Sequence, residues 1–289
     1  MRSGRARRAL PGLALALAVA LAGALWAGRA GAHQYWLAPS RYVVAPHTAV
    51  EVSAAAGTGF HGERKPWSPA RCVRFVGRAT RTLDFARAAT VGDLVWARFA
   101  PSDDGGAMLA YESNFAQIEL PAAEFDAYLE EEGLREPLET RRRAATATPG
   151  RERYRRCAKT WLAGRDSKRA LQPFGLPLEI VPLRVPGDDP ALRVRVLWNG
   201  RPLAGALVKA WRSDLARDGA SRDPGARDSV GLAWSGPTDA RGESAVPLAQ
   251  AGEWLVSVEH MVPSGDKTEA DWESTWASFT FERRATPTR

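Results

Sequence analysis

The chain has 289 residues and a formal net charge of +7, from 40 basic and 33 acidic side chains. Five of the arginines and no acidic residue lie in residues 1–32, so the remaining 257 residues carry 35 basic and 33 acidic side chains, a balance of +2. That balance excludes the concentrated basic surface of a nucleic-acid-binding protein. The length allows one large domain or two ordinary ones.

Residues 1–32 are typical of a secretory signal peptide. Arginines precede an apolar stretch at 10–26, and Ala30-Gly31-Ala32 gives the small-x-small pattern that signal peptidase accepts. Cleavage after Ala32 would leave a mature chain that begins with His33. We therefore expect a periplasmic or secreted protein, with a retained N-terminal anchor as the alternative. No later stretch is long and apolar enough to cross a bilayer, so we expect no transmembrane span in the mature chain.

Residues 34–120 predict a series of short strands, because apolar and polar residues alternate, for example at 50–52 and 71–76. Residues 55–67 are rich in glycine and proline and predict a loop, which carries His61.

The period changes at residues 121–134, where apolar residues recur at i, i+3 and i+4 between a proline and a glycine. This pattern predicts a helix. A second helical stretch is predicted over 136–143, with a continuation near 151–162. Together they predict a helical insertion near 121–162 in an otherwise β protein.

The last hundred residues predict strands and tight turns. Residues 192–198 alternate and end at Asn199-Gly200, a strong hairpin signal. The polar stretch 212–231 is predicted to be a loop, and residues 254–261 and 276–281 are predicted strands. A linker at 186–190 divides the mature chain into two predicted domains.

The fold expected from these elements is mainly β. It consists of two β-sandwich domains of the immunoglobulin or transthyretin-like kind, residues 33–186 and 187–289, with a short helical insertion in the first.

The chain has two cysteines, Cys72 and Cys157. In an oxidising compartment an even pair can form a disulfide, and two free buried thiols are the alternative. No Cys-x-x-Cys zinc motif is present.

His33 is the first candidate metal ligand. At a free N terminus, its α-amino group and imidazole can chelate one ion, which suits copper(II) or nickel(II). His260 ends an apolar row that alternates from Trp254, so it is either a core residue or a ligand at the rim of the sandwich. His61 is the third candidate ligand. The alternative for His33 is a residue that happens to follow the cleavage site.

Asp271 and Glu273 lie in an acidic stretch after His260. Ligating histidines usually donate their other N–H group to a carboxylate, so these two side chains are candidates to orient a ligand. A solvated acidic loop is the alternative.

Signatures of common enzymes are missing. The chain contains no Gly-x-Ser-x-Gly elbow, no phosphate-binding glycine loop and no His-Glu-x-x-His motif. We expect no catalytic activity; oxidative chemistry at a histidine-bound copper is the remaining enzymatic alternative.

Several segments together resemble one known family. They are His-Gln-Tyr-Trp-Leu-Ala-Pro at 33–39, the helical segment 125–134, and residues 175–182, 252–261 and 271–281. The family is a bacterial group of exported proteins of unassigned function, associated with the periplasmic component of nickel and cobalt ABC-type uptake systems. The C-terminal part also resembles the transthyretin-like sandwich found beside some carboxypeptidases, through Gly-x-Pro-Leu-x-Gly-Ala at 200–206 and Thr-Asp-x-x-Gly at 238–242.

The resemblance implies a periplasmic protein that binds or delivers a divalent transition metal, nickel or cobalt, with a membrane metal transporter as its partner. His33 and His260 match positions where that family carries histidines. The alternative is a non-catalytic envelope scaffold, or a module that binds a glycan or a protein through its aromatic residues, without metal.

Overall fold

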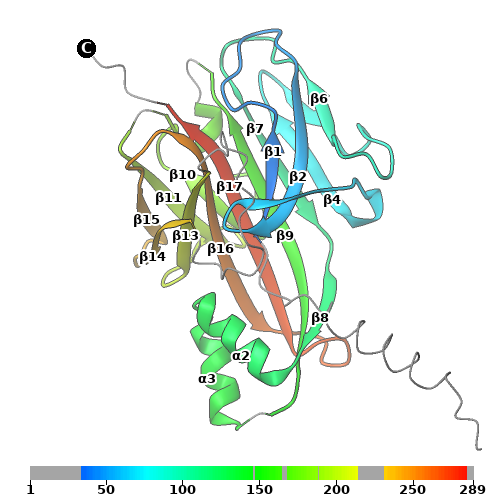
Figure 1. Cartoon of the computed structure of the whole chain (residues 1–289), viewed down its shortest axis with the longest axis vertical. Coiled ribbons are helices and arrows are strands. Elements are labelled where there is room, and N and C mark those ends of the chain that lie inside the picture. The colour runs from blue at the N-terminus through cyan, green and yellow to red at the C-terminus, as the bar shows by residue number, and fades with distance from the viewer. Residues whose placement is uncertain (1–33, 146, 165–167, 188, 214–230, 285–289) are drawn as a thin grey trace, which may run out of the picture. The chain divides into compact units, whose positions relative to one another are not determined.

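A computed structural model describes residues 34–145, 147–164, 168–187, 189–213 and 231–284. The predicted signal peptide, His33 and most of the predicted loop at 212–231 lie outside these residues. In the described residues, one large mixed sheet is flanked by two smaller ones, as Figure 1 shows.

The large sheet has the strand order β14-β13-β16-β17-β9-β7-β4-β5, and β8 also pairs with β9. Its central pair, β9 and β17, is parallel and its other pairs are antiparallel. The strands are β4 (Cys72–Arg78), β5 (Thr82–Asp84), β7 (Ala107–Ser113), β8 (Ala116–Leu120), β9 (Gly150–Leu162), β13 (Leu207–Ser213), β14 (Leu232–Pro237), β16 (Gly252–Pro263) and β17 (Trp272–Arg283).

The two smaller sheets have four strands each in the described residues. One contains β1 (Gln34–Pro39), β2 (Val50–Thr58), β3 (His61–Lys65) and β6 (Ala97–Phe99). The other contains β10 (Leu178–Pro182), β11 (Ala191–Trp198), β12 (Arg201–Pro202) and β15 (Glu243–Pro247). The helices are α2 (Ala122–Glu131) and α3 (Arg135–Arg143), with short 3-10 turns at Pro69–Arg71 and Lys168–Leu171.

Both faces of the large sheet are buried. On β16, alternate residues Val256 and Val258 pack in one core with β10 and β11. The other face, which we call the helix face, carries Leu255, Ser257, Glu259 and Met261 of β16. It is covered by the sheet of β1 and β2 in one part and by α2 and α3 in another. The mainly β fold with sandwich-like layers is thus confirmed.

Strands from both sides of residue 187 lie in the large sheet, since β7 and β9 precede it and β13, β16 and β17 follow it. The division into domains 33–186 and 187–289 stays a prediction. No helix in the described part of the chain is long and apolar enough to cross a membrane.

The two predicted helices at 121–134 and 136–143 are confirmed as α2 and α3. The predicted helical continuation at 151–162 is wrong, because these residues form the strand β9. Arg151 and Arg153 alternate with inward residues of β9 and bind the carboxylates of Asp271 and Glu273, whereas Glu152 turns into the core. The helical insertion therefore ends at Arg143.

The predicted loop at 55–67 is also wrong in its first eleven residues, 55–65, where β2 and β3 form a hairpin. Gly59 and Phe60 turn the chain with φ values of 61° and 67°. Gly57 and Gly62 face each other, and a Cβ added at Gly57 would overlap the carbonyl oxygen of His61. Glycine at both positions allows the backbones of β2 and β3 to approach closely.

Asn199 and Gly200 form the predicted hairpin turn, with φ values of 48° and 78° between β11 and β12. Both values lie in the left-handed region that a type I′ turn requires.

In the structure neither Cys72 nor Cys157 is in a disulfide, and the alternative of free buried thiols describes Cys157, whereas Cys72 is half-buried. Cys72 packs with the core on the helix face, whereas Cys157 packs in the core on the other face. β7 lies between their strands, so the backbones are roughly 9–10 Å apart, beyond the ~7 Å that a disulfide spans.

Candidate functional site

A belt of buried polar side chains crosses the helix face between the two apolar regions that cover it. Each of its members is at most 7% exposed. The members of this polar belt are Tyr128, Glu132, Glu152, Lys209, Glu259, Ser274 and Ser278. Tyr128 comes from α2 and Glu132 follows that helix, while the other side chains project from strands of the large sheet.

Tyr128 connects two of the carboxylates. Its hydroxyl donates to Oε1 of Glu259 and lies 3.4 Å from Oε1 of Glu152. Ser274 also donates to Glu152. The ring of Tyr128 stacks on Trp276 at a centroid distance of 5.9 Å, which fixes the direction of the hydroxyl.

The third carboxylate, Glu132, forms an ion pair of 3.0 Å with Lys209 of β13. Lys209 is the only cation among the members of the polar belt, against three carboxylates. Arg156, on the neighbouring part of β9, adds a second positive charge that acts on Glu152 and Glu259.

Burial dominates the electrostatics of the polar belt. It raises the pKa of Glu152 to about 7, against the opposing effects of Ser274 and Arg156. Burial, with the charges of Glu132 and Glu152, raises the pKa of Glu259 well above its usual value. The belt therefore favours a bound proton or a bound cation over three free negative charges.

Two polar atoms of the belt have no hydrogen-bond partner among the described residues: Oε2 of Glu259 and Oγ of Ser278. Buried polar atoms are nearly always hydrogen-bonded in folded proteins, and an unpartnered carboxylate oxygen is costly. An additional hydrogen-bond donor would stabilise either atom, and a cation would stabilise the carboxylate oxygen of Glu259.

The first strand leads toward this place. Thr280 of β17 donates a hydrogen bond of 2.9 Å to the carbonyl oxygen of Leu37. Two residues earlier, Tyr35 lines a pocket together with Arg156, which is paired in register with Trp276. Trp276 in turn is paired with Glu259. From Leu37 toward its N-terminal end, β1 therefore runs from Thr280 toward the part of the large sheet that contains Glu259.

The structure places the two described candidate histidines, His61 and His260, apart. His61 begins β3 and is exposed, in the small sheet that covers the helix face. His260 follows the parity of Val258, away from the helix face, and its ring lies 4.7 Å from that of Trp198. Burial lowers the pKa of His260. His33 lies outside the described residues, so its predicted pairing with His260 is untested.

Asp271 and Glu273 bind arginines rather than a histidine. Asp271 forms an ion pair of 2.9 Å with Arg151, and Glu273 one of 2.6 Å with Arg153. The Arg151 hydrogen bond lowers the pKa of Asp271. Within the described ranges, no group of three or more His, Cys, Asp or Glu side chains is placed to hold a metal ion by itself.

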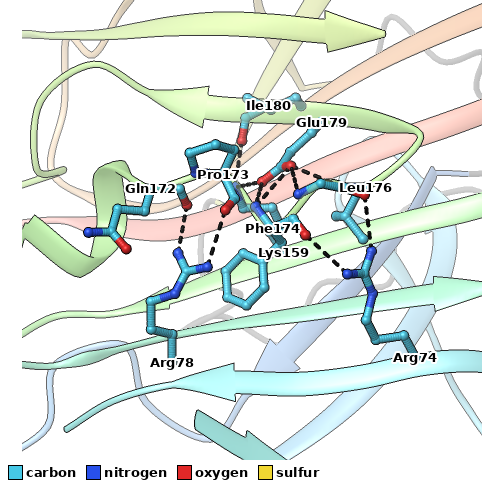
Figure 2. Close-up of polar contacts among 10 residues, drawn as sticks. Arg74, Arg78, Lys159, Gln172, Pro173, Phe174, Leu176, Glu179 and Ile180 are labelled. Atoms are coloured by element: carbon cyan, nitrogen blue, oxygen red, sulfur yellow. Dashed lines mark hydrogen bonds and ion pairs between the residues drawn. The ribbon is translucent and has the colours of Figure 1, made fainter. Parts of the chain in front are cut away.

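A second buried charged cluster, shown in Figure 2, is structural. Lys159 and Glu179 form an ion pair of 2.7 Å, and Glu179 accepts hydrogen bonds from the backbone N–H groups of residues 174–176. Arg74 and Arg78 bind the backbone carbonyls of residues 172–175. These contacts hold the segment before β10 against the large sheet.

The sequence interpretation did not identify Glu132, Glu152 and Glu259 as functional candidates. One signal was available for Glu259: it shares its face of β16 with Leu255 and Met261, which are large apolar residues. Large apolar residues on both sides indicate that this face of the strand is buried, and that Glu259 is buried with it.

Fold and site define a mainly β protein with layered sheets and a buried acidic site. The chain belongs to the family described as "Domain of unknown function (DUF4198)", which matches residues 30–262. A search of curated proteins finds no match.

Two solved structures show weak similarity. Escherichia coli alpha-2-macroglobulin activated by porcine elastase is 12% identical, with 88% of this chain and 23% of that chain covered and a TM-score of 0.21. The three N-terminal domains of the bacteriophage RB49 highly immunogenic outer capsid protein are 6% identical, with 86% and 59% covered and a TM-score of 0.17. This chain therefore spans less than two thirds of either structure.

Proposed function

We propose that this protein is an exported, non-catalytic binding protein for a divalent transition metal. The site would combine a mature N terminus at His33 with the carboxylate of Glu259. The observation that carries the proposal is Oε2 of Glu259, a buried carboxylate oxygen without a hydrogen-bond partner among the described residues.

Chain connectivity supports the participation of His33. Consecutive Cα atoms are 3.8 Å apart, so the Cα of residue 33 is within about 7.6 Å of that of Tyr35. Tyr35 lines a pocket with Arg156 of β9. Arg156 is paired with Trp276 on the neighbouring strand β17, and Trp276 is paired with Glu259 on β16. A free α-amino group at residue 33 is therefore within reach of the polar belt.

The donor set fits the ion. An amine, an imidazole and a carboxylate are nitrogen and oxygen ligands suited to nickel, cobalt or copper. The proposal depends on His33, because no group of three or more His, Cys, Asp or Glu side chains in the described ranges is placed to hold a metal ion. The negative surplus of the polar belt would stabilise a bound cation.

The finer assignments rest on the resemblance of the sequence. It favours nickel or cobalt over copper, a membrane metal transporter as partner, and a transthyretin-like sandwich at 187–289. We propose a periplasmic location, after cleavage between Ala32 and His33, on the basis of the signal-peptide pattern.

The test is calorimetric titration of nickel, cobalt and copper into mature protein whose His33 N terminus is verified by mass spectrometry. We expect one site of sub-micromolar affinity. One extra residue before His33 should abolish the chelate, and Glu259→Gln should weaken binding by about tenfold or more. His61→Ala serves as a matched histidine control and should bind as the wild type does.

His260→Ala separates this site from the predicted His33–His260 pair, because only the latter loses affinity in that variant. Unchanged binding in the N-terminally extended protein would contradict the proposal. So would the absence of binding to all three metals, which would favour the scaffold or glycan-binding alternative.

A further inference from the structure

A pocket of about 260 Å³ opens on the helix face beside the polar belt, between β1, β3, β7 and β9. Its aromatic lining consists of Tyr35, Trp96, Tyr111 and Tyr154. The rings of Tyr35 and Tyr111 lie 5.9 Å apart, and those of Trp96 and Tyr111 lie 5.0 Å apart, edge to face. Trp96 and Tyr111 are buried behind this wall, and Tyr35 and Tyr154 are its partly exposed aromatic side chains.

Hydrogen bonds hold this wall in place without any ligand. The indole nitrogen of Trp96 donates to the carbonyl oxygen of Lys65 at 2.8 Å. The guanidinium of Arg71 donates to the carbonyl oxygen of Phe115 at 2.7 Å. A preformed wall lowers the entropic cost of binding a ligand.

The charge of the lining is positive. Lys65, Arg71 and Arg156 line the pocket, and its described lining contains no aspartate or glutamate. Arg156 also acts on Glu152 and Glu259, so part of its charge is compensated. Lys65 and Arg71 form no ion pair with a carboxylate in the described ranges, and their charges are the main attraction for an anion.

We propose that this pocket binds a small organic anion that carries one flat ring. Its carboxylate or phosphate head group would meet Arg71 and Lys65, and its ring would lie against the partly exposed ring of Tyr35. The volume limits the ligand, because pockets for drug-sized molecules span roughly 300–1,000 Å³. This site is separate from the proposed metal site and needs no metal.

The experiment is calorimetry on the mature protein in the presence of a chelator, which removes any contribution of a metal. The probes are benzoate and phenyl phosphate, which distinguish the two head groups, with benzyl alcohol and benzylamine as neutral and cationic counterparts. We expect saturable binding of at least one of the two anions, about tenfold or more tighter than that of either counterpart.

Adjacent residues of β3 provide a matched pair of variants. Lys65 lines the pocket, whereas its neighbour Arg64 is exposed and does not. Lys65→Gln and Arg71→Gln should each weaken anion binding by about tenfold, and Arg64→Gln should leave it unchanged.

The proposal is overturned if neither anion binds more tightly than benzyl alcohol, or if Arg64→Gln weakens binding as much as Lys65→Gln does. The comparison of the four probes uses the unmodified protein, so it decides the question even if a variant does not fold.

Discussion

The ammonium nitrogen of Lys159 lies 2.7 Å from a carboxylate oxygen of Glu179, and both side chains are only 1% exposed. Lys159 also donates to the carbonyl oxygen of Ile180 at 3.0 Å. This pair joins β9, in the middle of the large sheet, to β10 in the sheet that covers it. Burial lowers the pKa of Lys159, and the charge of Glu179 opposes that effect.

Lys159→Met should lower the free energy of unfolding by about 3–5 kcal/mol, because it leaves the Glu179 carboxylate buried without its cation. Adding Glu179→Gln should cost less than the sum of the two single substitutions, since the double variant contains no unpaired charge. Denaturant unfolding measures both. The exposed pair Arg98–Glu51, at 2.8 Å with 70% and 48% exposure, is the control, and Arg98→Met should cost under about 1 kcal/mol. Equal losses at the two pairs would contradict the prediction.

The metal-free protein should become less stable as the pH rises from about 4.5 to about 7. Burial raises the pKa of Glu152 to about 7 in the folded protein, so there the folded state holds a proton that the unfolded chain has lost. Stability falls with pH wherever the folded state binds more protons. The contribution of Glu152 to this change is on the order of 3 kcal/mol.

Chemical unfolding of the wild type and of Glu152→Gln, measured in chelator across this pH range, tests that dependence. The variant should show a clearly smaller slope, and Glu259 contributes to the remainder in the same direction. A slope that stays the same in Glu152→Gln would exclude Glu152 as its source.

Gly200→Ala should destabilise the protein by about 1–2 kcal/mol, because the residue has a φ of 78° and L-residues are strained there. No side chain or backbone atom is within 4 Å of an added Cβ, so backbone strain is the whole effect. Gly265 is the matched control, since it has the same open surroundings but no positive φ. Gly265→Ala should be close to neutral in thermal unfolding, and similar losses at both sites would contradict the backbone explanation.

Both cysteines should react with iodoacetamide in denaturant without a reductant, because neither is in a disulfide. In the folded protein Cys157 should be protected, since burial raises the pKa of its thiol to about 12, and Cys72 should react slowly. Mass spectrometry counts the modified sites. A mass two units lower in the unreduced protein, with no labelling, would show a bridge instead.

Local patterns predict much of this fold. The helical period of residues 121–134, the turn residues Asn199-Gly200 and the alternation of β16 depend on near neighbours, and all three appear in the structure. Local patterns do not predict β9 as a strand, because it pairs with β17, about 120 residues away. The arginine Arg153 of β9 binds the carboxylate of Glu273 on β17.

The candidate site is less predictable than the fold. The sequence interpretation singled out His33, His61 and His260 by residue type, and the structure places the latter two apart. Glu132, Glu152 and Glu259 come from three distant segments and meet only because both α2 and the large sheet contribute to the polar belt. A sequence pattern along one strand does not reveal such a meeting.

The parallel pairing of β9 with β17 has a consequence for synthesis. Residues 150–162 are made long before residues 272–283, yet each is the other's neighbour at the centre of the large sheet. Until the last strand is complete, one edge of β9 has no partner, and unpaired strand edges promote aggregation. Pairing of β9 with β17 must therefore wait until residues 272–283 have been synthesised, and until then the open edge of β9 needs protection from other chains.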